Sequence, residues 1–454
     1  MNAAALVTLL LVATAPALPP FDPLPVLRDY LRIDTSNPPG NELKTATFLK
    51  NILDREGIEA EIVTFAPDRA NLVARVPGDG SKKALILSHH MDVVHADRSR
   101  WTADPFGAAI EGGYLFGRGA LDMKTTGILQ LAALIRLKRE GVPLARDVIF
   151  IGTADEEVEA VGMQALIARR PELFAGAELS LTEGDVIDAK GGRVRSWNVS
   201  VAEKSVLWLK LTAKGRGGHA ATPAAEGTAV DALVRALDRV RRYETPIGVS
   251  PDVQRYFTAL DRSFPGLAPG KLAHLEASLR GDAAFRKAFL AEPERAARVR
   301  NTIAITVLLG APQTNVIPSE ASAHLDCRVL PGEDPNALIA AIRTAIDDPG
   351  IAIEPLQPVV AATSSGTDTQ LFKAIEATAA RMAPGVPVVP TLLTSWTESA
   401  LLRPLGIAAY GFDPLALDEK EAALSHGDDE RVSLENVTRG AEILYAIVKS
   451  TAAK

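Results

Sequence analysis

Apolar segments that run directly into acidic or histidine residues recur along the first part of this chain, and they constrain the fold more than any other feature. The four segments and their polar ends are Ala84–Leu87 with His90 and Asp92, Tyr114–Phe116 with Asp122, Val148–Ile151 with Asp155-Glu156-Glu157, and Glu178–Leu181 with Glu183. Short apolar runs of this kind are typical of buried strands, and strands that alternate with helices form a largely parallel sheet. We therefore expect the polar residues to meet at one rim of an α/β domain, where such folds bind ligands.

The residue types at this rim are those of a metal site. His90 and Asp92 are one residue apart, so the carboxylate can orient the imidazole through its second nitrogen. Far downstream, Ser425-His426-Gly427 lies in a polar loop before an expected helix and can supply another imidazole. Two histidines and three carboxylates can hold two zinc ions that share one carboxylate, and a fourth carboxylate can act as general base. Any one acidic strand end, taken alone, is better explained as a solvated turn, and only the recurrence of such ends favours a site.

Composition excludes several other classes. The chain has 454 residues, of which 47% are hydrophobic and 23% charged, and these values are ordinary for a soluble globular protein. The net charge of -7 includes no basic block that would indicate a nucleic-acid partner. Cys327 is the single cysteine, so a thiolate zinc cluster and an intrachain disulfide are both excluded. Any metal must be held by nitrogen and oxygen ligands.

Residues 1–20 predict a secretory signal peptide. The stretch from Ala3 to Ala13 is almost wholly apolar, and small residues that suit signal-peptidase cleavage follow it. It is too short to span a bilayer, which takes about 20 apolar residues. The n-region has no Lys or Arg, so the alternative is an apolar helix that stays attached. We expect an exported protein, periplasmic or secreted, with no membrane association once the leader is removed.

The pattern changes near residue 202 and predicts a second domain. The expected elements are strands at Ser205–Ala213, Thr302–Leu309, Ser319–Val329 and Ile351–Pro355, with helices at Thr228–Arg242 and Asn336–Ile346. Their order, β-α-β-β-α-β, is that of a ferredoxin-like unit. We therefore predict a catalytic domain in two parts, 21–201 and 357–454, and an inserted α+β lid domain, 202–356. Within the lid, 244–300 is a helical extension expected beside the lid or over the cleft.

Five motifs in a fixed order point to a family. They are His90-x-Asp92, Gly117-Arg118-Gly119 through Asp122-Met123-Lys124, Asp155-Glu156-Glu157, Glu183-Gly184 and Ser425-His426-Gly427. In this set the chain resembles the zinc exopeptidase and amidohydrolase family of glutamate carboxypeptidase, succinyl-diaminopimelate desuccinylase, acetylornithine deacetylase, aminoacylase and carboxypeptidase S. The resemblance covers nearly the whole chain after the leader. It implies a mixed, largely parallel sheet with helices on both faces and a ferredoxin-like lid.

The resemblance also implies roles for the matching residues. The implied metal ligands are His90 and Glu183 on the first ion, Glu157 and His426 on the second, and Asp122 between the two. Asp92 would stand behind His90. Glu156 would be the base that activates water and later protonates the leaving amine. The implied cofactor is a pair of zinc ions, with cobalt or manganese as alternatives.

Three lid residues match the family as well. His219, in Gly217-Gly218-His219, would stabilise the oxyanion of the scissile carbonyl, in some relatives across a dimer interface, and the alternative is a solvated histidine after a turn. Arg328 would clamp the substrate's free carboxylate with its planar fork, and Asn315 would add a hydrogen bond. Cys327, beside Arg328, is expected to serve core packing. A homodimer through the lid is possible, although the extension at 244–300 could block it.

The substrate stays open at this level. We expect a two-metal hydrolase that cleaves an amide bond beside a free carboxylate, acting on a small peptide as an exopeptidase or, alternatively, on an N-acyl amino acid. A protein that keeps the fold and only binds carboxylates is a third alternative. Ser395-Trp396-Thr397-Glu398-Ser399 replaces a Gly-Thr-Asp element found in many relatives, so the pocket that it helps to form is not predicted.

Overall fold

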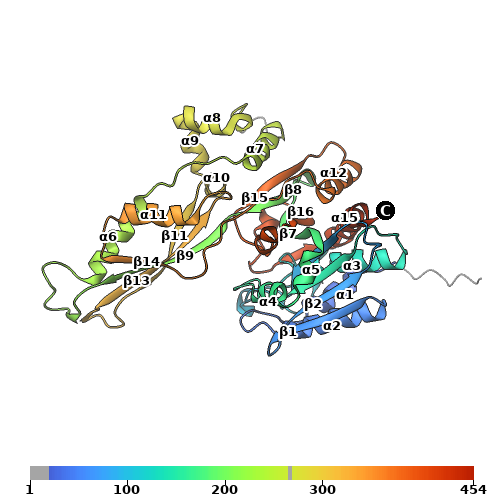
Figure 1. The fold of residues 1–454 in the computed structure, drawn as a ribbon, viewed down its shortest axis with the longest axis horizontal. Coiled ribbons are helices and arrows are strands. Elements are labelled where there is room, and N and C mark those ends of the chain that lie inside the picture. The colour runs from blue at the N-terminus through green and yellow to red at the C-terminus, as the bar shows by residue number, and fades with distance from the viewer. Residues whose placement is uncertain (1–19, 264–267) are drawn as a thin grey trace, which may run out of the picture.

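The computed structural model of the chain describes residues 20–263 and 268–454. The predicted signal peptide lies outside these residues, apart from its last position. Within the described part, no helix is both long enough and apolar enough to cross a membrane. Figure 1 shows two bodies: a larger one built on a wide sheet and a smaller one connected to it by long strands.

The larger body is organised around a mixed eight-stranded sheet. Its strands, in sheet order, are β1 (Glu59–Ala66), β2 (Arg69–Val76), β6 (Val148–Thr153), β3 (Ala84–His90), β7 (Ala177–Lys190), β16 (Ala408–Leu417), β8 (Arg193–Glu203) and β15 (Val388–Leu393). The four strands β6, β3, β7 and β16 are parallel, whereas β1, β2 and β6 pair in antiparallel fashion. This agrees with the predicted largely parallel sheet.

Helices cover both faces of this sheet, as predicted. One face packs against α1 (Pro23–Leu31), α2 (Glu42–Arg55), α3 (Lys124–Arg139), α12 (Gln370–Met382) and α15 (Leu434–Ala452), and the other against α4 (Val161–Arg169), α5 (Pro171–Ala175) and α13 (Ser399–Leu402). Leu85 and Leu87 of β3 lie in the first core, and Ile86 lies in the second. Because alternate side chains of a strand point to opposite faces, a strand covered on both sides must be apolar throughout. That requirement explains why β3 and β6 could be predicted from their apolar runs in the sequence.

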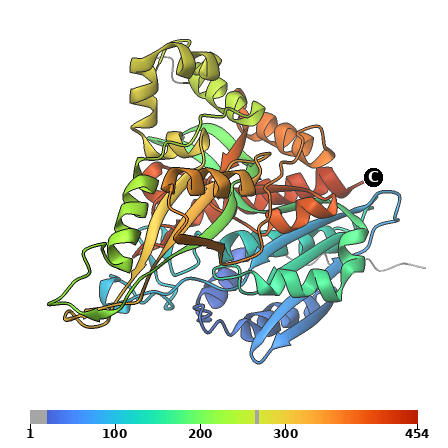
Figure 2. The same cartoon turned by 60° about the vertical axis from the view of Figure 1, so that its left-hand side comes forward.

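The smaller body is the predicted lid. It contains β9 (Ser205–Lys214), α6 (Ala229–Arg242), β11 (Thr302–Leu309), β13 (Glu320–Val329), α11 (Pro335–Ile346) and β14 (Ile351–Pro355). Its antiparallel sheet has the order β11-β13-β9-β14, and α6 and α11 share its own hydrophobic core (Figure 2). This is the ferredoxin-like arrangement. At the far tip, β10 (Gly218–His219) pairs with β12 (Val316–Ile317).

Two placements were expected for the helical extension, beside the lid or over the cleft, and the structure shows the first. It comprises α7 (Pro251–Ser263), α8 (Leu275–Gly281), α9 (Ala283–Leu290) and α10 (Pro293–Arg298). Phe257 and Phe289 belong to the core of the larger body, and α7 contacts β15 at the edge of the wide sheet. Burial of these rings draws the extension onto the sheet edge, so it stands beside the lid and does not cover the cleft.

A small sheet joins two loops that are distant in the sequence. It consists of β4 (Ile110–Glu111), β5 (Tyr114–Phe116) and β17 (Arg431–Ser433). Arg431 pairs with Phe116 and Ser433 with Tyr114. The short helix α14 (Glu419–Ala422) precedes the loop that leads into β17. Through this pairing, the segment after β5 and the loop before β17 are brought side by side.

Candidate metal centre

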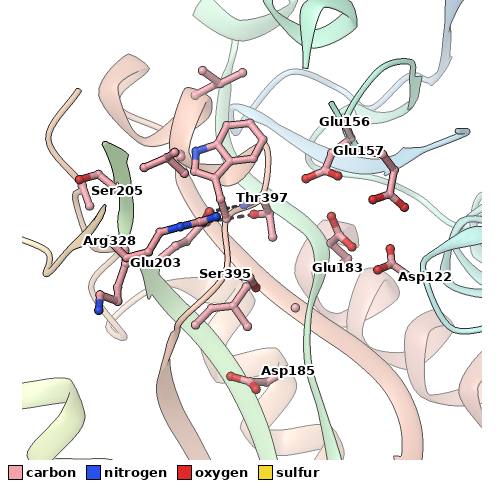
Figure 3. Close-up of a pocket in the computed structure, with 18 of the residues that line it drawn as sticks. Asp122, Glu156, Glu157, Glu183, Asp185, Glu203, Ser205, Arg328, Ser395 and Thr397 are labelled. Atoms are coloured by element: carbon pink, nitrogen blue, oxygen red, sulfur yellow. Dashed lines mark hydrogen bonds between the residues drawn. The ribbon is translucent and has the colours of Figure 1, made fainter. Parts of the chain in front are cut away.

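Four carboxylates face one another at the rim of the wide sheet. Figure 3 shows the side chains of Asp122, Glu156, Glu157 and Glu183 pointing toward a common space. Glu156 and Glu157 follow the carboxyl end of β6, and Asp122 lies just before the start of α3. The carboxyl ends of β3 and β6 meet at one edge, as the sequence pattern predicts. Tyr114–Phe116, expected as a further strand of this sheet, is instead β5 of the small antiparallel sheet, so Asp122 reaches the rim from the turn before α3.

The two imidazoles complete this cluster from opposite sides. His90 Nε2 lies 2.9 Å from Asp122 Oδ1 and 3.5 Å from Glu183 Oε2. His426 Nε2 lies 3.0 Å from Asp122 Oδ2 and 3.2 Å from Glu157 Oε2. Asp122 therefore lies between the His90 half and the His426 half of the cluster, with one carboxylate oxygen toward each. All five residues predicted as ligands are brought together.

The donor set fits divalent cations. The ligand atoms of His90, Asp122 and Glu157 lie within 4.8 Å of one another, and so do those of His90, Glu156 and Glu183. Glu157 Oε1 is buried and has no hydrogen-bond partner among the described residues. Burial raises the pKa of Glu183 to about 8. So many buried carboxylates in one place need positive charge to stay ionised, and nitrogen and carboxylate ligands suit zinc and related metals.

Glu156 shares a raised pKa with Glu157 and Glu183. Burial, and then the charge of Glu183, raises the pKa of Glu156 well above its ordinary value. A carboxylate with a raised pKa is suited to accept a proton near neutral pH and to release it again. This is the property required of the predicted base.

Asp92 has a broader role than the one predicted. The closest contact of His90 Nδ1 is the backbone oxygen of Asp92 at 3.0 Å, whereas the carboxylate Oδ1 lies at 3.7 Å. The carboxylate accepts hydrogen bonds from the amides of Glu156 and Glu157, each at 3.2 Å, and from Asn37 Nδ2 at 2.8 Å. Asp92 thus fixes the turn that carries both glutamates. Asn37 was not identified from the sequence, because its partners are remote along the chain.

Glu183 does not lie at the end of a strand, contrary to the prediction. It lies within β7, which continues to Lys190. The register between β7 and β16 shifts near Gly184 and Gly411, and a Cβ at Gly184 would lie 2.5 Å from the Gly411 Cα. Asp413, which is buried in β16, accepts the Gly184 amide at 3.0 Å. The irregularity at this close approach occurs immediately beside Glu183.

A cavity of about 670 Å³ adjoins the cluster and reaches the lid. Asp122, Glu156 and Glu183 line one part of it, and Arg328 of β13 lines another. Figure 3 shows Arg328 across the cavity from the carboxylates. Its Nε and Nη2 already donate to Asp326, at 2.8 and 3.1 Å. The Nε edge of the Arg328 guanidinium is therefore occupied by Asp326, and the Nη1 edge is the one that can bind a substrate carboxylate.

His219 and Asn315 are not brought to the cavity of this chain. Both are exposed at the tip of the lid, and neither lines the cavity. The Ala220 amide donates to the Asn315 backbone oxygen at 3.1 Å, so the two residues are neighbours. Within a single chain, the structure separates this pair from the carboxylate cluster.

Sequence reasoning missed a buried network on the wall of the cavity. Glu203 Oε1 accepts hydrogen bonds from Arg403 Nη1 at 2.8 Å and from Thr397 Oγ1 at 3.0 Å. This network fixes the loop that carries Trp396, which also lines the cavity. Next to Glu203, the buried Lys204 donates to the backbone oxygens of Ala297 and Arg300. A Glu-Lys pair at a strand end gives no signal of its own, so these roles depend on tertiary contacts.

Comparisons with known proteins agree with this geometry. A family model described as peptidase family M20/M25/M40 matches residues 86–450. Aminoacylase-1A of Rattus norvegicus is 27% identical over 434 residues, which cover 94% of each chain. "Probable carboxypeptidase S-like 2" of Dictyostelium discoideum is 27% identical over 393 residues, covering 82% of this chain and 72% of its own. An M20 family metallo-carboxypeptidase from Sulfolobus solfataricus superposes with a TM-score of 0.73 at 18% identity and covers 95% of this chain and 99% of its own.

Proposed function

The chain belongs to peptidase family M20/M25/M40, as its motifs predict, and on this premise we propose that it hydrolyses N-acyl amino acids at a pair of zinc ions. The observation that carries the proposal is one cavity lined both by the carboxylate cluster and by the Arg328 guanidinium. An amide bond can lie at the cluster while a carboxylate on the same molecule meets the cation. The alternative of an inactive carboxylate-binding protein would require a broken ligand set, whereas all five ligand candidates lie together.

The proposed zinc ligands are those that the motifs indicate. His90 and Glu183 would hold one ion and Glu157 and His426 the other, with Asp122 shared between them. When bound, such ions polarise a carbonyl oxygen and lower the pKa of water toward about 7. Cobalt and manganese accept similar ligands and remain alternatives for the native metal.

The chain's own groups would perform the remaining steps. Glu156 takes the proton of the attacking water and delivers it to the nitrogen of the leaving amine, for which its raised pKa is suited. The free edge of the Arg328 fork holds the substrate carboxylate and so sets the direction of the amide bond. Asp92, through its bonds to the amides of Glu156 and Glu157, keeps both carboxylates in place.

The sequence relatives support N-acyl amino acids over peptides. The motifs alone favour an exopeptidase, but aminoacylase-1A matches this chain over 94% of both lengths. Cleavage of a peptide from its carboxyl end is the second candidate, and the carboxypeptidase S-like relative favours it. Both reactions use an amide beside a free carboxylate, so the cavity accommodates either.

A substrate panel tests the proposal. We expect N-acetyl-methionine to be hydrolysed with a kcat/KM at least tenfold above that of Ala-Met, and N-acetyl-methionine amide to be hydrolysed poorly because it lacks the carboxylate. A preference for the dipeptide would favour the second candidate. Equal hydrolysis of the acid and its amide would contradict the role of Arg328.

We also propose a homodimer formed through the lid. β11 is an edge strand, and Leu308 and Leu309 on it are 65% and 55% exposed. Val234 of α6 is 59% exposed and lines the same shallow hollow. Edge strands and apolar patches of this kind are sites of chain pairing. Sedimentation should show a dimer that Leu308→Lys converts to a monomer, and a wild-type monomer would overturn the proposal.

Export is proposed from residues 1–20 alone. If the leader is functional, the mature protein recovered outside the cytoplasm should lack it, and intact mass measures this directly.

A further inference from the structure

Arg118 and Glu430 form a buried ion pair directly behind the candidate metal centre. Arg118 Nη1 lies 2.6 Å from Glu430 Oε2, and their side chains are 3% and 0% exposed. Neither residue is a candidate metal ligand, general base or substrate contact. A buried charge of this kind must be fully paired to be tolerated, so its partners define what it holds in place.

Glu430 holds the turn that carries Asp122. Its carboxylate accepts the amides of Gly119 at 3.2 Å, Leu121 at 2.6 Å and Asp122 at 3.1 Å. Gly119 has φ +89°, a conformation that glycine adopts readily. Three amides and one guanidinium thus converge on one carboxylate, which fixes the backbone of Asp122.

Arg118 holds the loop that carries His426. Its Nη2 donates to the backbone oxygens of His426 at 3.3 Å and His95 at 3.4 Å, and its guanidinium lies over the ring of Trp101 at 5.3 Å. His426 has φ 60°, in the left-handed region that non-glycine residues adopt only when their surroundings impose it. Arg118 supplies part of that constraint from outside the loop.

The pair therefore links two segments that are far apart along the chain. Glu430 follows His426 by four residues, and Arg118 precedes Asp122 by four. The pairing of β17 with β5 holds the same two segments in register. By contrast, His90 and Glu183 lie on β3 and β7 of the wide sheet and do not depend on this connection.

We propose that Arg118 and Glu430 are positioning residues that present Asp122 and His426 to a shared metal ion. This inference rests on the proposed two-metal function and goes beyond it, since neither residue is placed to touch the ion or the substrate. Because His426 belongs to one half of the centre only, breaking the pair should weaken one ion more than the other.

Glu430→Gln is the direct test. An amide keeps the shape, but its nitrogen cannot accept, so either the Arg118 and Gly119 donors or the Leu121 and Asp122 amides lose their acceptor. Arg118→Lys is the second variant, because lysine keeps the charge but cannot reach Glu430 and the His426 oxygen with one planar fork. Glu203→Gln is the matched control, since the Glu203–Arg403 pair is equally buried, at 2% and 4%, and holds none of the candidate ligands.

Three measurements on the full-length protein separate positioning from general stability. They are stepwise zinc affinity by competition with a chromophoric chelator, the visible spectrum of the cobalt-loaded protein, and the melting temperature of the metal-free protein. Because Asp122 is shared, we expect Glu430→Gln to raise the dissociation constants of both ions, by about 10–100-fold for one of them and by clearly less for the other. The cobalt spectrum should change. Arg118→Lys should lie between this variant and wild type, and Glu203→Gln should lower the melting temperature without either effect.

The outcomes distinguish the inference from the function on which it rests. If the wild-type protein binds two ions and both variants bind them as wild type does, or weaken both ions equally, the positioning role is wrong and the proposed function stands. If neither variant folds while Glu203→Gln does, the pair is a folding element and the inference is likewise overturned. A wild-type protein that binds fewer than two ions overturns both.

Discussion

The two bodies of this protein contribute to the proposed site in different ways. The larger body brings each of the two imidazoles within 3.5 Å of two candidate ligand carboxylates, and His90 in this cluster is only 1% exposed. The lid places Arg328 on the cavity wall, where it is 26% exposed and paired with Asp326, and leaves His219 and Asn315 at an exposed tip. The first set is complete within one body, whereas the second depends on where the lid stands and, for His219 and Asn315, on the proposed dimer.

The difference lies in how each set is held. β3 and β6 are covered by hydrophobic cores on both faces, so the residues at their ends cannot move without unpacking the sheet. The lid has a separate core, and the chain passes between the lid and the larger body after β8, on either side of the helical extension, and after β14. The proposed metal ligands thus lie on the rigid larger body, and the proposed substrate contacts lie on the lid.

The largest expected effect comes from the sheet. Glu156→Gln should lower kcat by about 10²–10⁴-fold, because it removes the group that transfers the proton, and should leave metal content unchanged. Steady-state kinetics and metal analysis on one preparation measure both. Glu159→Gln, a change to an exposed glutamate on the same cavity, is the control. Wild-type turnover by Glu156→Gln would refute the assignment of the base.

His219 tests whether the lid acts across a dimer. His219→Ala should lower kcat by about 10²–10³-fold if the histidine stabilises an oxyanion in the partner's site. Mixed dimers of His219→Ala and Glu156→Gln chains would then contain one intact site, so mixing two inactive preparations should restore about a quarter of wild-type activity. Failure of the mixture to regain activity, with exchange of subunits verified, would show that His219 does not act in the partner's site.

Arg328→Lys tests the substrate contact of the lid. Lysine keeps the charge but loses the fork, so kcat/KM for N-acyl amino acids should fall by about 10–100-fold, mainly through KM. Asp326→Asn would show whether the neighbouring acid orients the fork, in which case KM rises, or competes with the substrate, in which case KM falls. An unchanged KM for Arg328→Lys would place the substrate carboxylate elsewhere.

The smallest effect concerns Lys204, at the crossing between the two bodies. Burial lowers the pKa of Lys204 to about 7, with Arg328 lowering it further and Glu333 and Asp326 opposing. A lysine in the unfolded chain has a pKa of about 10.4, so between pH 7 and 10 the unfolded chain holds a proton that the native chain has lost. Stability conferred by this site therefore rises with pH over that range.

Lys204→Met removes this dependence. The difference in free energy of unfolding, wild type minus Lys204→Met, should increase from pH 7 to pH 10 in denaturant titrations. Lys214→Met, at the exposed end of β9, should show no such trend. A difference for Lys204→Met that stays constant with pH would mean that the buried ammonium keeps an ordinary pKa.

The sequence predicted the ends of β3 and β6, but not the continuation of β7 beyond Glu183 and not the central strand β16. β3 and β6 each begin with an uninterrupted apolar run, so the point where each run meets polar residues could be recognised in the sequence. β16 contains Gly411, Asp413 and Pro414, which normally argue against a strand interior. They are present because Gly411 must approach Gly184 closely and Asp413 must accept the Gly184 amide.

Motif order identified the ligand candidates, but not what holds them. The bonds from Asp92 to the Glu156 and Glu157 amides, and from Glu430 to the Asp122 turn, depend on tertiary contacts between segments that are distant in the chain. The pairing of Arg328 with Asp326 is an exception, since residues two apart on a strand share a face. The two-residue spacing of Asp326 and Arg328 on an expected strand is enough to predict this pair from the sequence.

Zinc titration of the metal-free protein, with Asp122→Asn alongside wild type, measures whether the cluster holds two ions through a shared carboxylate. We expect two ions per wild-type chain and, for Asp122→Asn, weaker binding of both, because this carboxylate has one oxygen toward each half of the cluster. Two ions bound with unchanged affinity by Asp122→Asn, or fewer than two ions on the wild-type chain, would contradict this expectation.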